Sequence, residues 1–445
     1  MGTGIGHFIP LFFFLATCVA CLVALAGRPL IGLYCLIPLL PYRTLRDHFL
    51  DYPLGGNIIT ILVVCVILGA LFQGKNLPKS KLYLTWLIFA IYLYFSMWIG
   101  TLLGNGPAPL WLSDINFVTW KDYMLQPLIF VAAGLAIQNR KDVRTVLIVA
   151  AIAMAMIDRS ALLNSLSRSW VQFDESKRDG GPLGFAGSNG LAAFLAQFSL
   201  FFWGFAQFVK TKKYKIAFYV LVAASMFATM YTFSRAAYIA IVLGAVILGI
   251  LKTRKLLVIV AIFLFTWQVV LPVAVTQRIT MTQDSSGHLE QSAEERIRLW
   301  EAAKSSFASS PIVGIGYATF QMTAHTDNLR DTHNWYVKVL VETGLIGFVI
   351  VLALLFQAIA LSYQLFRRES DPLYQGLGLG LLLLMFGTII LNFFGDRWTY
   401  LEINGLLWVI AATAVRVKSL DKQPLASTPK MPEPSDIVNP YLLYR

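Results

Sequence analysis

His333 and Asn334 are the residues in this 445-residue chain whose types and setting could best support catalysis. They lie near the end of a long polar stretch, and nine residues separate them from Gly344, which Gly347 follows at the start of a new apolar run. A histidine can take a proton from a hydroxyl near neutral pH, and Asn334 could orient the imidazole or the acceptor. A lone histidine more often has a structural role, but this one shares its stretch with several arginines. We therefore predict that His333 is a general base.

Arg235 could bind an anion. It lies beside Ser234 in the sequence TFSRAAY (232–238), at the boundary between two apolar segments. An arginine at the membrane is costly and usually faces a cavity and a partner, although its side chain can also reach out to the lipid headgroups. Because small residues flank Arg235 and would let a substrate reach its guanidinium, we favour a functional role.

Two further arginines, Arg296 and Arg298, lie in the sequence EERIRLWEAAKSSF (294–307). Its apolar residues recur at helical spacing, so we expect an amphipathic helix on the outer membrane surface that ends before Pro311. Two residues that are two positions apart cannot share one helix face, so one arginine can point to a site while the other is solvated. The apolar face that we expect consists of Ile297, Trp300, Ala303 and Phe307.

Two weaker candidates for supporting roles are Asn189 and His325. Asn189 follows Ser188 at the entry to a membrane helix in GPLGFAGSNGLAAFLA (181–196). A glycine-rich helix start can offer backbone N–H groups to an anion, or it can be an N-cap with small-residue packing. Both interpretations stay open. His325 shares the polar stretch with His333.

The composition defines the class of protein. With 57% hydrophobic and 13% charged residues, the chain is an all-α polytopic membrane protein. The net charge of +12 would suggest nucleic acid in a soluble domain, but the Lys and Arg residues cluster between apolar runs. We interpret them as topology signals and contacts with the lipid bilayer, and expect no nucleic-acid partner.

We expect neither a cofactor nor a metal. Cys18 and Cys21 have no partner pair for a metal site, and no P-loop or dinucleotide-binding glycine motif is present. Asp114 and Asp122 are the alternative, as metal ligands in a loop, but they form no tight acidic pair.

Thirteen apolar runs, the second of them short, predict about 12 transmembrane helices and one large extracytoplasmic helical loop. Basic breaks fall at alternate ends of the runs and mark cytoplasmic ends by the positive-inside rule, which places 42–56, 104–122, 163–187 and 276–342 outside. The runs are 8–26, 29–41, 57–73, 82–103, 123–138, 145–162, 188–209, 215–232, 234–251, 256–275, 343–366, 373–394 and 398–415. The predicted parts are a bundle of about ten spans (1–275), a periplasmic loop domain with the active site (276–342), C-terminal spans (343–415) and a disordered cytoplasmic tail (416–445).

These pieces, in this order, resemble the O-antigen ligase/polymerase superfamily, bacterial membrane enzymes that move glycans off undecaprenyl diphosphate. The resemblance extends over about residues 120–400 in architecture. Its specific motifs are Ser234-Arg235, Arg296 with Trp300 four residues later, Pro311-x-x-Gly314-x-Gly316, and His333-Asn334-x9-Gly344-x-x-Gly347. The last motif is similar to that of the ligases that attach O-antigen to lipid A–core.

The resemblance implies a GT-C-like bundle in the bacterial inner membrane, with an active site that faces the periplasm. It implies an inverting, metal-independent transfer from an undecaprenyl diphosphate-linked glycan to lipid A–core, without a nucleotide sugar. Arg235 and Arg296 would bind the diphosphate, Arg298 is a further candidate for the same anionic site, and His333 would activate the acceptor hydroxyl.

Two alternatives differ from a ligase. A polymerase of the same superfamily uses the same donor, but it often has a second long external loop with a repeated Arg-x10-Gly pattern, which we do not find. A transporter for the lipid-linked sugar is expected to have broken spans in matching halves and ionisable residues at the midplane. Here the ionisable residues gather at the external ends of the spans, so we favour the ligase.

Overall fold

The described part of the chain is helical, and no strand occurs in it. The computed structural model describes residues 8–111, 114–175, 178, 180–281, 291–322 and 332–420, and for 291–295 only the backbone. Each of the thirteen apolar runs overlaps a helix, although α6 and α14 each begin eight residues before their run and the run 256–275 is divided between α11 and α12. The α-helices are α1 Ile9–Leu25, α2 Pro29–Leu39, α3 Arg43–Asp47, α4 Ile58–Phe72, α5 Lys81–Leu102, α6 Ile115–Ala136, α7 Arg140–Leu166, α8 Gly187–Ala206, α9 Lys212–Met230, α10 Arg235–Leu251, α11 Lys255–Val270, α12 Val273–Thr280, α13 Gln291–Ser309, α14 Trp335–Arg368, α15 Pro372–Asn392 and α16 Leu401–Leu420.

Seven helical segments of the described chain are long and apolar enough to cross a membrane, or eight if α11 and α12, bent by 107°, form one broken span. This confirms an α-helical polytopic membrane protein. It does not confirm about twelve spans, and that count stays a prediction. Some of the apolar runs form helices that are too short to cross a membrane alone. The helix of the second run, α2, has 11 residues and is therefore about 16 Å long, whereas a membrane core is roughly 30 Å thick.

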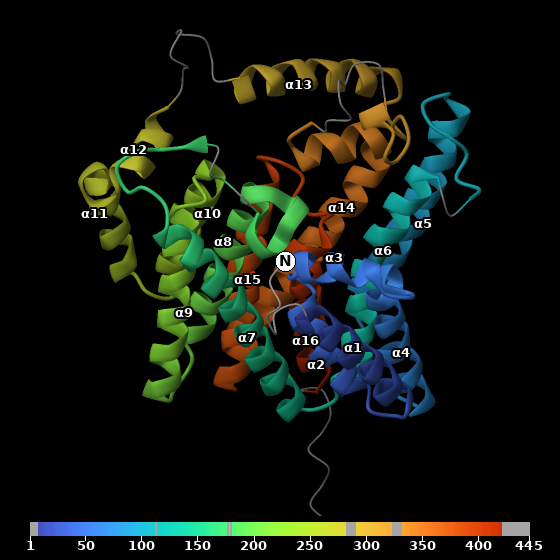
Figure 1. Ribbon diagram of the computed structural model, residues 1–445, viewed down its shortest axis with the longest axis horizontal. Coiled ribbons are helices and arrows are strands. Elements are labelled where there is room, and N and C mark those ends of the chain that lie inside the picture. Colours follow the sequence, from blue (N-terminus) through green and yellow to red (C-terminus); the bar gives the residue numbers. More distant parts are fainter. Residues whose placement is uncertain are drawn as a thin grey trace, which may run out of the picture.

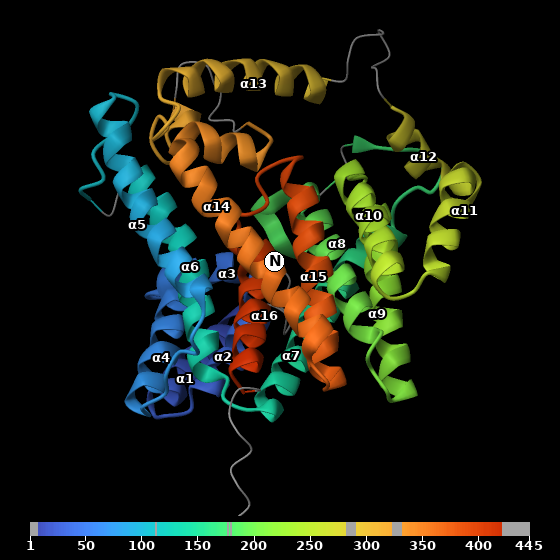
Figure 2. The ribbon, with the colours of Figure 1, turned by 180° about the vertical axis from the view of Figure 1, so that it is seen from behind.

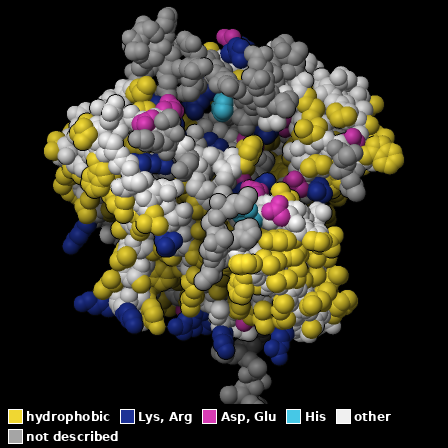
Figure 3. All heavy atoms as spheres, viewed as in Figure 1, with side chains coloured by type: hydrophobic (Ala, Val, Ile, Leu, Met, Phe, Trp, Pro, Cys, Tyr) yellow, Lys and Arg dark blue, Asp and Glu magenta, His cyan; other side chains and the backbone are white. Residues whose placement is uncertain are grey.

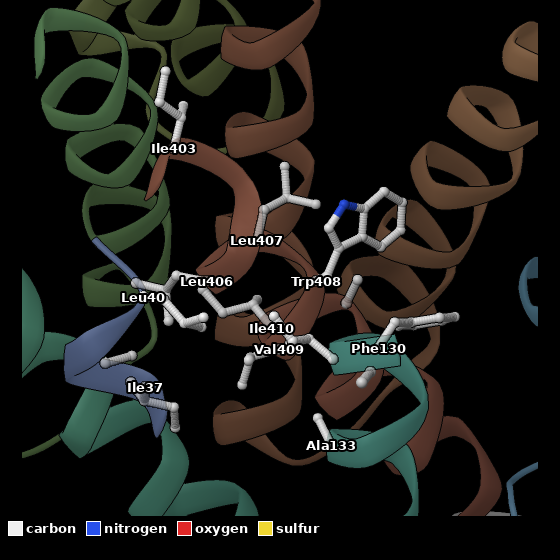
Figure 4. Close-up of a cluster of buried hydrophobic side chains, with 14 of the residues drawn as sticks. Ile37, Leu40, Phe130, Ala133, Ile403, Leu406, Leu407, Trp408, Val409 and Ile410 are labelled. Carbon is white, nitrogen blue, oxygen red and sulfur yellow. The ribbon is translucent and has the colours of Figure 1, made fainter. Parts of the chain in front are cut away.

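The bundle is built around α16. Side chains all round this helix are buried, among them Leu407 and Ile410 at 0% exposure and the polar Asn404 near its start. Figure 4 shows its side chains packed against Phe130 of α6 and against Ile37 and Leu40. Inside a membrane every backbone polar group needs a partner, so the polar start of α16 requires help from its neighbours.

Gln126 of α6 supplies that help. Its amide nitrogen donates to the carbonyls of Trp398 (3.1 Å) and Thr399 (2.8 Å), just before α16 begins. Its amide oxygen accepts from the indole N–H of Trp408 at 2.9 Å. The start of α16 is therefore fixed to α6.

The two ends of the bundle differ (Figures 1 and 2). At one end α13 lies across the bundle, above the first turns of α14. At the other end α7 and α15 begin and α16 ends. We call these the α13 end and the opposite end. Figure 3 shows a broad apolar band over the lower half of one face, with Lys and Arg side chains below it and a hollow edged by charged side chains above it.

Helix α14 is broken at Gly344, where φ is +63° and ψ is −168°. The break leaves backbone groups on both sides without helical partners, and the loop 311–316 supplies them. Ile315 and Gly316 donate to the carbonyls of Val341 and Glu342, both at 3.0 Å, while Leu345 and Ile346 donate to those of Pro311 (3.0 Å) and Ile312 (3.2 Å). The loop 311–316, which contains Gly314 and Gly316, therefore docks onto the kink of α14 at Gly344.

We expect Gly344→Ala to lower the free energy of unfolding by roughly 3 kcal/mol. A Cβ atom at Gly344 would lie 2.3 Å from the Ile312 carbonyl oxygen and 2.6 Å from the Gly314 nitrogen, in a backbone region that suits glycine alone. Gly74→Ala is the control, since Gly74 has a similar φ of +67° but open space around it. Thermal unfolding of the purified variants measures both changes, and equal losses would contradict the docking role of Gly344.

Candidate functional site

His333 has a strained backbone, with φ at +50°. Non-glycine residues rarely adopt this conformation, and those that do often lie at functional sites. The neighbours of His333 hold it there. Asn334 is the N-cap of α14, and its side-chain oxygen accepts from the backbone N–H groups of Tyr336 (3.0 Å) and Val337 (3.3 Å). The Thr332 hydroxyl donates to the Asn334 carbonyl at 2.7 Å.

The first turns of α14 are also anchored to the α15–α16 loop. The Lys338 ammonium lies 3.1 Å from a carboxylate oxygen of Asp396, which is 3% exposed. Burial alone would raise the pKa of Asp396, but the charge of Lys338 and the hydrogen bonds from Thr399 outweigh it, and the pKa is below its usual value. Trp335 stacks on Trp398 with 4.8 Å between ring centroids. The segment that carries His333 therefore rests on a rigid base.

Helix α13 meets the His333 segment through Trp300. The indole N–H of Trp300 donates to the carbonyl of Thr332 at 2.9 Å. Arg296 lies one helical turn before Trp300 and so on the same side of α13. Its side chain is half-buried, whereas that of Arg298 is exposed. Of the two arginines, Arg296 is thus the one on the side of α13 that faces the His333 segment.

The buried face of α13 differs in part from the one we expected, although Ala303 and Phe307 do pack in it. Leu299 and Ala303 are each 1% exposed, whereas Ile297 and Trp300 are 49% and 44% exposed. Leu299 was not among the predicted apolar residues. The helix packs on α14 and on the loop 311–316, with Ala303 in a cluster that contains Ile315, Phe320 and Val341. A hydrophobic pattern cannot distinguish this support from a lipid surface.

The turn before α10 is surrounded by arginines that the sequence analysis missed. Three of them, from two segments, donate to three consecutive backbone carbonyls. The pairs are Arg168 with Tyr231, Arg178 with Thr232 at 3.1 Å, and Arg278 with Phe233 at 3.5 Å. They lie in the loop after α7 and on α12, both in parts of the chain that we predicted to be extracytoplasmic, and this location was the available signal.

Arg235 follows this turn as the first residue of α10. Its guanidinium donates to the carbonyl of Met281 at 2.8 Å, which links α10 to the chain just after α12. Ser234 is the N-cap residue; it is 4% exposed and its side chain makes no capping bond. We call Arg168, Arg178, Arg235 and Arg278 the arginine cluster.

Asn189 belongs to this cluster, and its role differs from the helix cap that we considered. Helix α8 starts at Gly187 with Ala186 at the N-cap, and no side chain caps it. The side-chain oxygen of Asn189 instead accepts from Arg178 at 2.9 Å. Arg178 thereby links Asn189 to Thr232 in the turn before Arg235, which is distant from Asn189 in sequence.

Positive charge dominates around the arginine cluster. The described residues of the segments 163–187, 231–235 and 273–281 include four arginines and two acidic residues, Asp174 and Glu175. Glu175 pairs with Arg178 at 3.0 Å, but it is 62% exposed and so screened by water. Burial lowers the pKa of Arg178, and the charge of Arg278 acts in the same direction, yet a guanidinium stays protonated at neutral pH. An anion would balance this excess.

The predicted role of His325 and the predicted absence of a metal are not tested by the structure. His325 lies outside the described residues. Within the described ranges, no group of three or more His, Cys, Asp or Glu side chains could hold a metal ion, and the absence of a metal requirement stays a prediction.

We expect Asn334→Ala to lower the free energy of unfolding by about 1 kcal/mol, the usual value of an N-cap. It should also impair the activity of the site, because the same cap holds His333 in its strained conformation. Asn334→Asp keeps an N-cap acceptor and should restore stability.

Ser80→Ala is the matched control for Asn334→Ala. The Ser80 hydroxyl caps α5 by accepting from Leu82 at 3.3 Å, far from His333 in the sequence. Thermal unfolding and turnover are measured for each variant. If Ser80→Ala reduces turnover as much as Asn334→Ala does, the cap has no specific role at the site.

Part of this chain matches a family of known proteins. Residues 218–352 match the family model described as O-Antigen ligase. The match begins in α9 and ends in α14, and it includes Ser234, Arg235, Arg296, Arg298 and His333. This confirms the resemblance to the O-antigen ligase superfamily over that segment. No curated protein matches the chain.

Proposed function

We propose, from this family match, that the protein is an O-antigen ligase of the bacterial inner membrane. It transfers a glycan from undecaprenyl diphosphate to a hydroxyl of lipid A–core at the periplasmic face. The observation that carries the proposal is that the matched segment contains both the arginine that opens α10 and the strained histidine that precedes α14.

The arginine cluster supports the donor part of the proposal. A diphosphate carries several negative charges, and guanidinium groups bind phosphate oxygens through paired N–H donors. Arg235 and Arg296 bind the diphosphate, and Arg178 and Arg278 hold the turn from which Arg235 extends. Arg298 is also a candidate, but its exposed position on α13 suits it less to a desolvated site.

The reaction follows from these assignments. The His333 imidazole takes the proton of the acceptor hydroxyl, and the hydroxyl oxygen attacks the anomeric carbon. The bond from that carbon to the diphosphate oxygen breaks, the anomeric configuration inverts, and the electron pair leaves with the diphosphate. Negative charge grows on the leaving group, and fixed guanidinium groups stabilise it. Each such donor can contribute on the order of 3 kcal/mol.

The distribution of basic residues supports the proposed orientation of the protein in the membrane. Lysines and arginines gather in the breaks at the opposite end, such as KTKKYK (210–215) and KTRK (252–255). By the positive-inside rule that end is cytoplasmic. The α13 end, with His333 and the arginine cluster, then faces the periplasm.

Reconstitution tests the proposal. The purified protein is incubated with an undecaprenyl diphosphate-linked glycan and lipid A–core, with and without EDTA, and the products are weighed by mass spectrometry. A ligase gives glycosylated lipid A–core in both conditions. Longer undecaprenyl-linked chains would identify a polymerase instead, and no transfer between competent substrates would favour a transporter. Loss of transfer in EDTA would overturn the metal-independent mechanism.

A further inference from the structure

A cavity of about 660 Å³ lies at the opposite end of the bundle, away from the arginine cluster. Its volume is within the range of ligand sites, roughly 300–1,000 Å³. Two helices form its walls with the same spacing of residues, i, i+3, i+4 and i+7, which places each set on one helix face. The wall residues are Ile148, Ala151, Ile152 and Ala155 of α7, and Tyr214, Ala217, Phe218 and Leu221 of α9.

The two walls meet at the inner end of the cavity. Just beyond them the Ser225 hydroxyl donates to the carboxylate of Asp158 at 2.6 Å and so joins α9 to α7. Toward the opposite end, Phe205, Phe208 and Leu373 line the space between the two helices. Ile148 and Ile152 are 45% and 54% exposed, so the cavity opens to the surface of the bundle. We call it the α7–α9 groove.

The mouth of the groove is basic. Arg140, Arg144, Lys210 and Asp371 line it. The guanidinium of Arg140 donates to both carboxylate oxygens of Asp371, at 2.6 and 3.1 Å, so this pair is balanced. Arg144 and Lys210 have exposed side chains, and in the described chain neither forms an ion pair or a side-chain hydrogen bond. Two positive charges thus remain for a ligand.

The dimensions of the groove fit one leaflet of a membrane. Eleven residues of α7 separate Arg144 at the mouth from Ala155 near the inner end, a distance of about 16 Å along the helix. Half of a bilayer core is roughly 15 Å thick. A molecule with an anionic head at the mouth and a hydrocarbon chain along the walls would match both the charge and the length.

We propose that the α7–α9 groove binds an acidic phospholipid, with its phosphate against Arg144 and Lys210 and an acyl chain between α7 and α9. Basic pockets between membrane helices bind lipid headgroups in this way. The charges lie at the mouth and the apolar walls extend inward from them, so the phospholipid comes from the leaflet at this end. This inference does not rest on the proposed transferase activity.

Photo-crosslinking tests the groove. The full-length protein is mixed with phosphatidylglycerol that carries a diazirine near the end of one acyl chain, irradiated and mapped by mass spectrometry. Crosslinks are expected in 148–155 and 214–221, several-fold more than with the matching phosphatidylcholine. The double variant Arg144→Gln with Lys210→Gln should reduce them about tenfold. Lys212→Gln, a neighbouring exposed lysine that does not line the groove, should leave them unchanged.

Two further measurements complete this test. Ala151→Phe fills the groove without touching its charges and should abolish crosslinking in 148–155 and 214–221; Ala155→Phe repeats the test if the first variant does not fold, as judged by its thermal midpoint. Equal labelling by both lipids, or labelling that survives these substitutions, would overturn the proposal. Displacement of the probe by equimolar undecaprenyl phosphate would also overturn it, because the groove would then take an isoprenoid chain.

Discussion

His333→Ala should reduce glycosyl transfer by about 10²- to 10⁴-fold, the usual contribution of a positioned general base. The expectation rests on two observations. His333 has a left-handed backbone that costs free energy, and hydrogen bonds of Thr332 and Asn334 hold it in that conformation. A strained residue that its neighbours hold in place on both sides indicates a functional role for that residue. Turnover of the reconstituted enzyme with lipid A–core measures the effect.

Two readouts separate a lost base from a damaged fold. His333→Ala should keep the thermal midpoint and the donor affinity of the wild type, because the imidazole acts on the acceptor. His48→Ala is the control, since His48 is an exposed histidine at the start of a short 3-10 helix, in the segment 42–56 that we also predict to be extracytoplasmic. Near wild-type turnover in His333→Ala would exclude His333 as the base.

The positions of most helices could be predicted from the sequence because each depends on a local pattern of residues. Runs of apolar residues indicate membrane helices, and Pro311 and the glycines that follow it indicate the turn after α13. Helix lengths and faces were harder to predict. Trp300, which we expected on the apolar face, is 44% exposed and Leu299 is buried instead. The partner of α13 is a folded loop on α14, and no property of the α13 sequence specifies that partner.

The candidate site was predicted only where one short segment holds the information. Arg235 and His333 lie in recognisable motifs, whereas Arg168, Arg178 and Arg278 come from loops 50 or more residues away or from another helix. What these three arginines share is that they donate to the backbone carbonyls of residues 231–233. A contact between a side chain and a distant backbone group cannot be predicted from the spacing of residues in the sequence. Asn189 was found for its place at a helix start, but its contact is Arg178.

Arg235→Ala should reduce transfer by roughly 10²-fold, equivalent to about 3 kcal/mol in the barrier. The diphosphate is charged before the reaction and more so in the transition state, so both donor affinity and the rate of the bound complex should fall. Arg235→Lys keeps the charge but loses the paired donors, and we expect it to recover only part of the activity.

Arg235 and Arg278 differ in burial, so their alanine variants should differ in stability. Arg278 is 6% exposed, donates to the Phe233 carbonyl and lies over the Phe173 ring at 5.1 Å, so Arg278→Ala should lower stability as well as activity. Arg235→Ala should lower activity with little change in the thermal midpoint, since Arg235 is less buried than Arg278 and its guanidinium bonds the Met281 carbonyl, at the end of the segment described after α12. Arg254→Ala, at the opposite end, should change neither. If Arg235→Ala and Arg278→Ala lose stability and activity in the same proportion, Arg235 is a structural residue, and the diphosphate must be bound elsewhere.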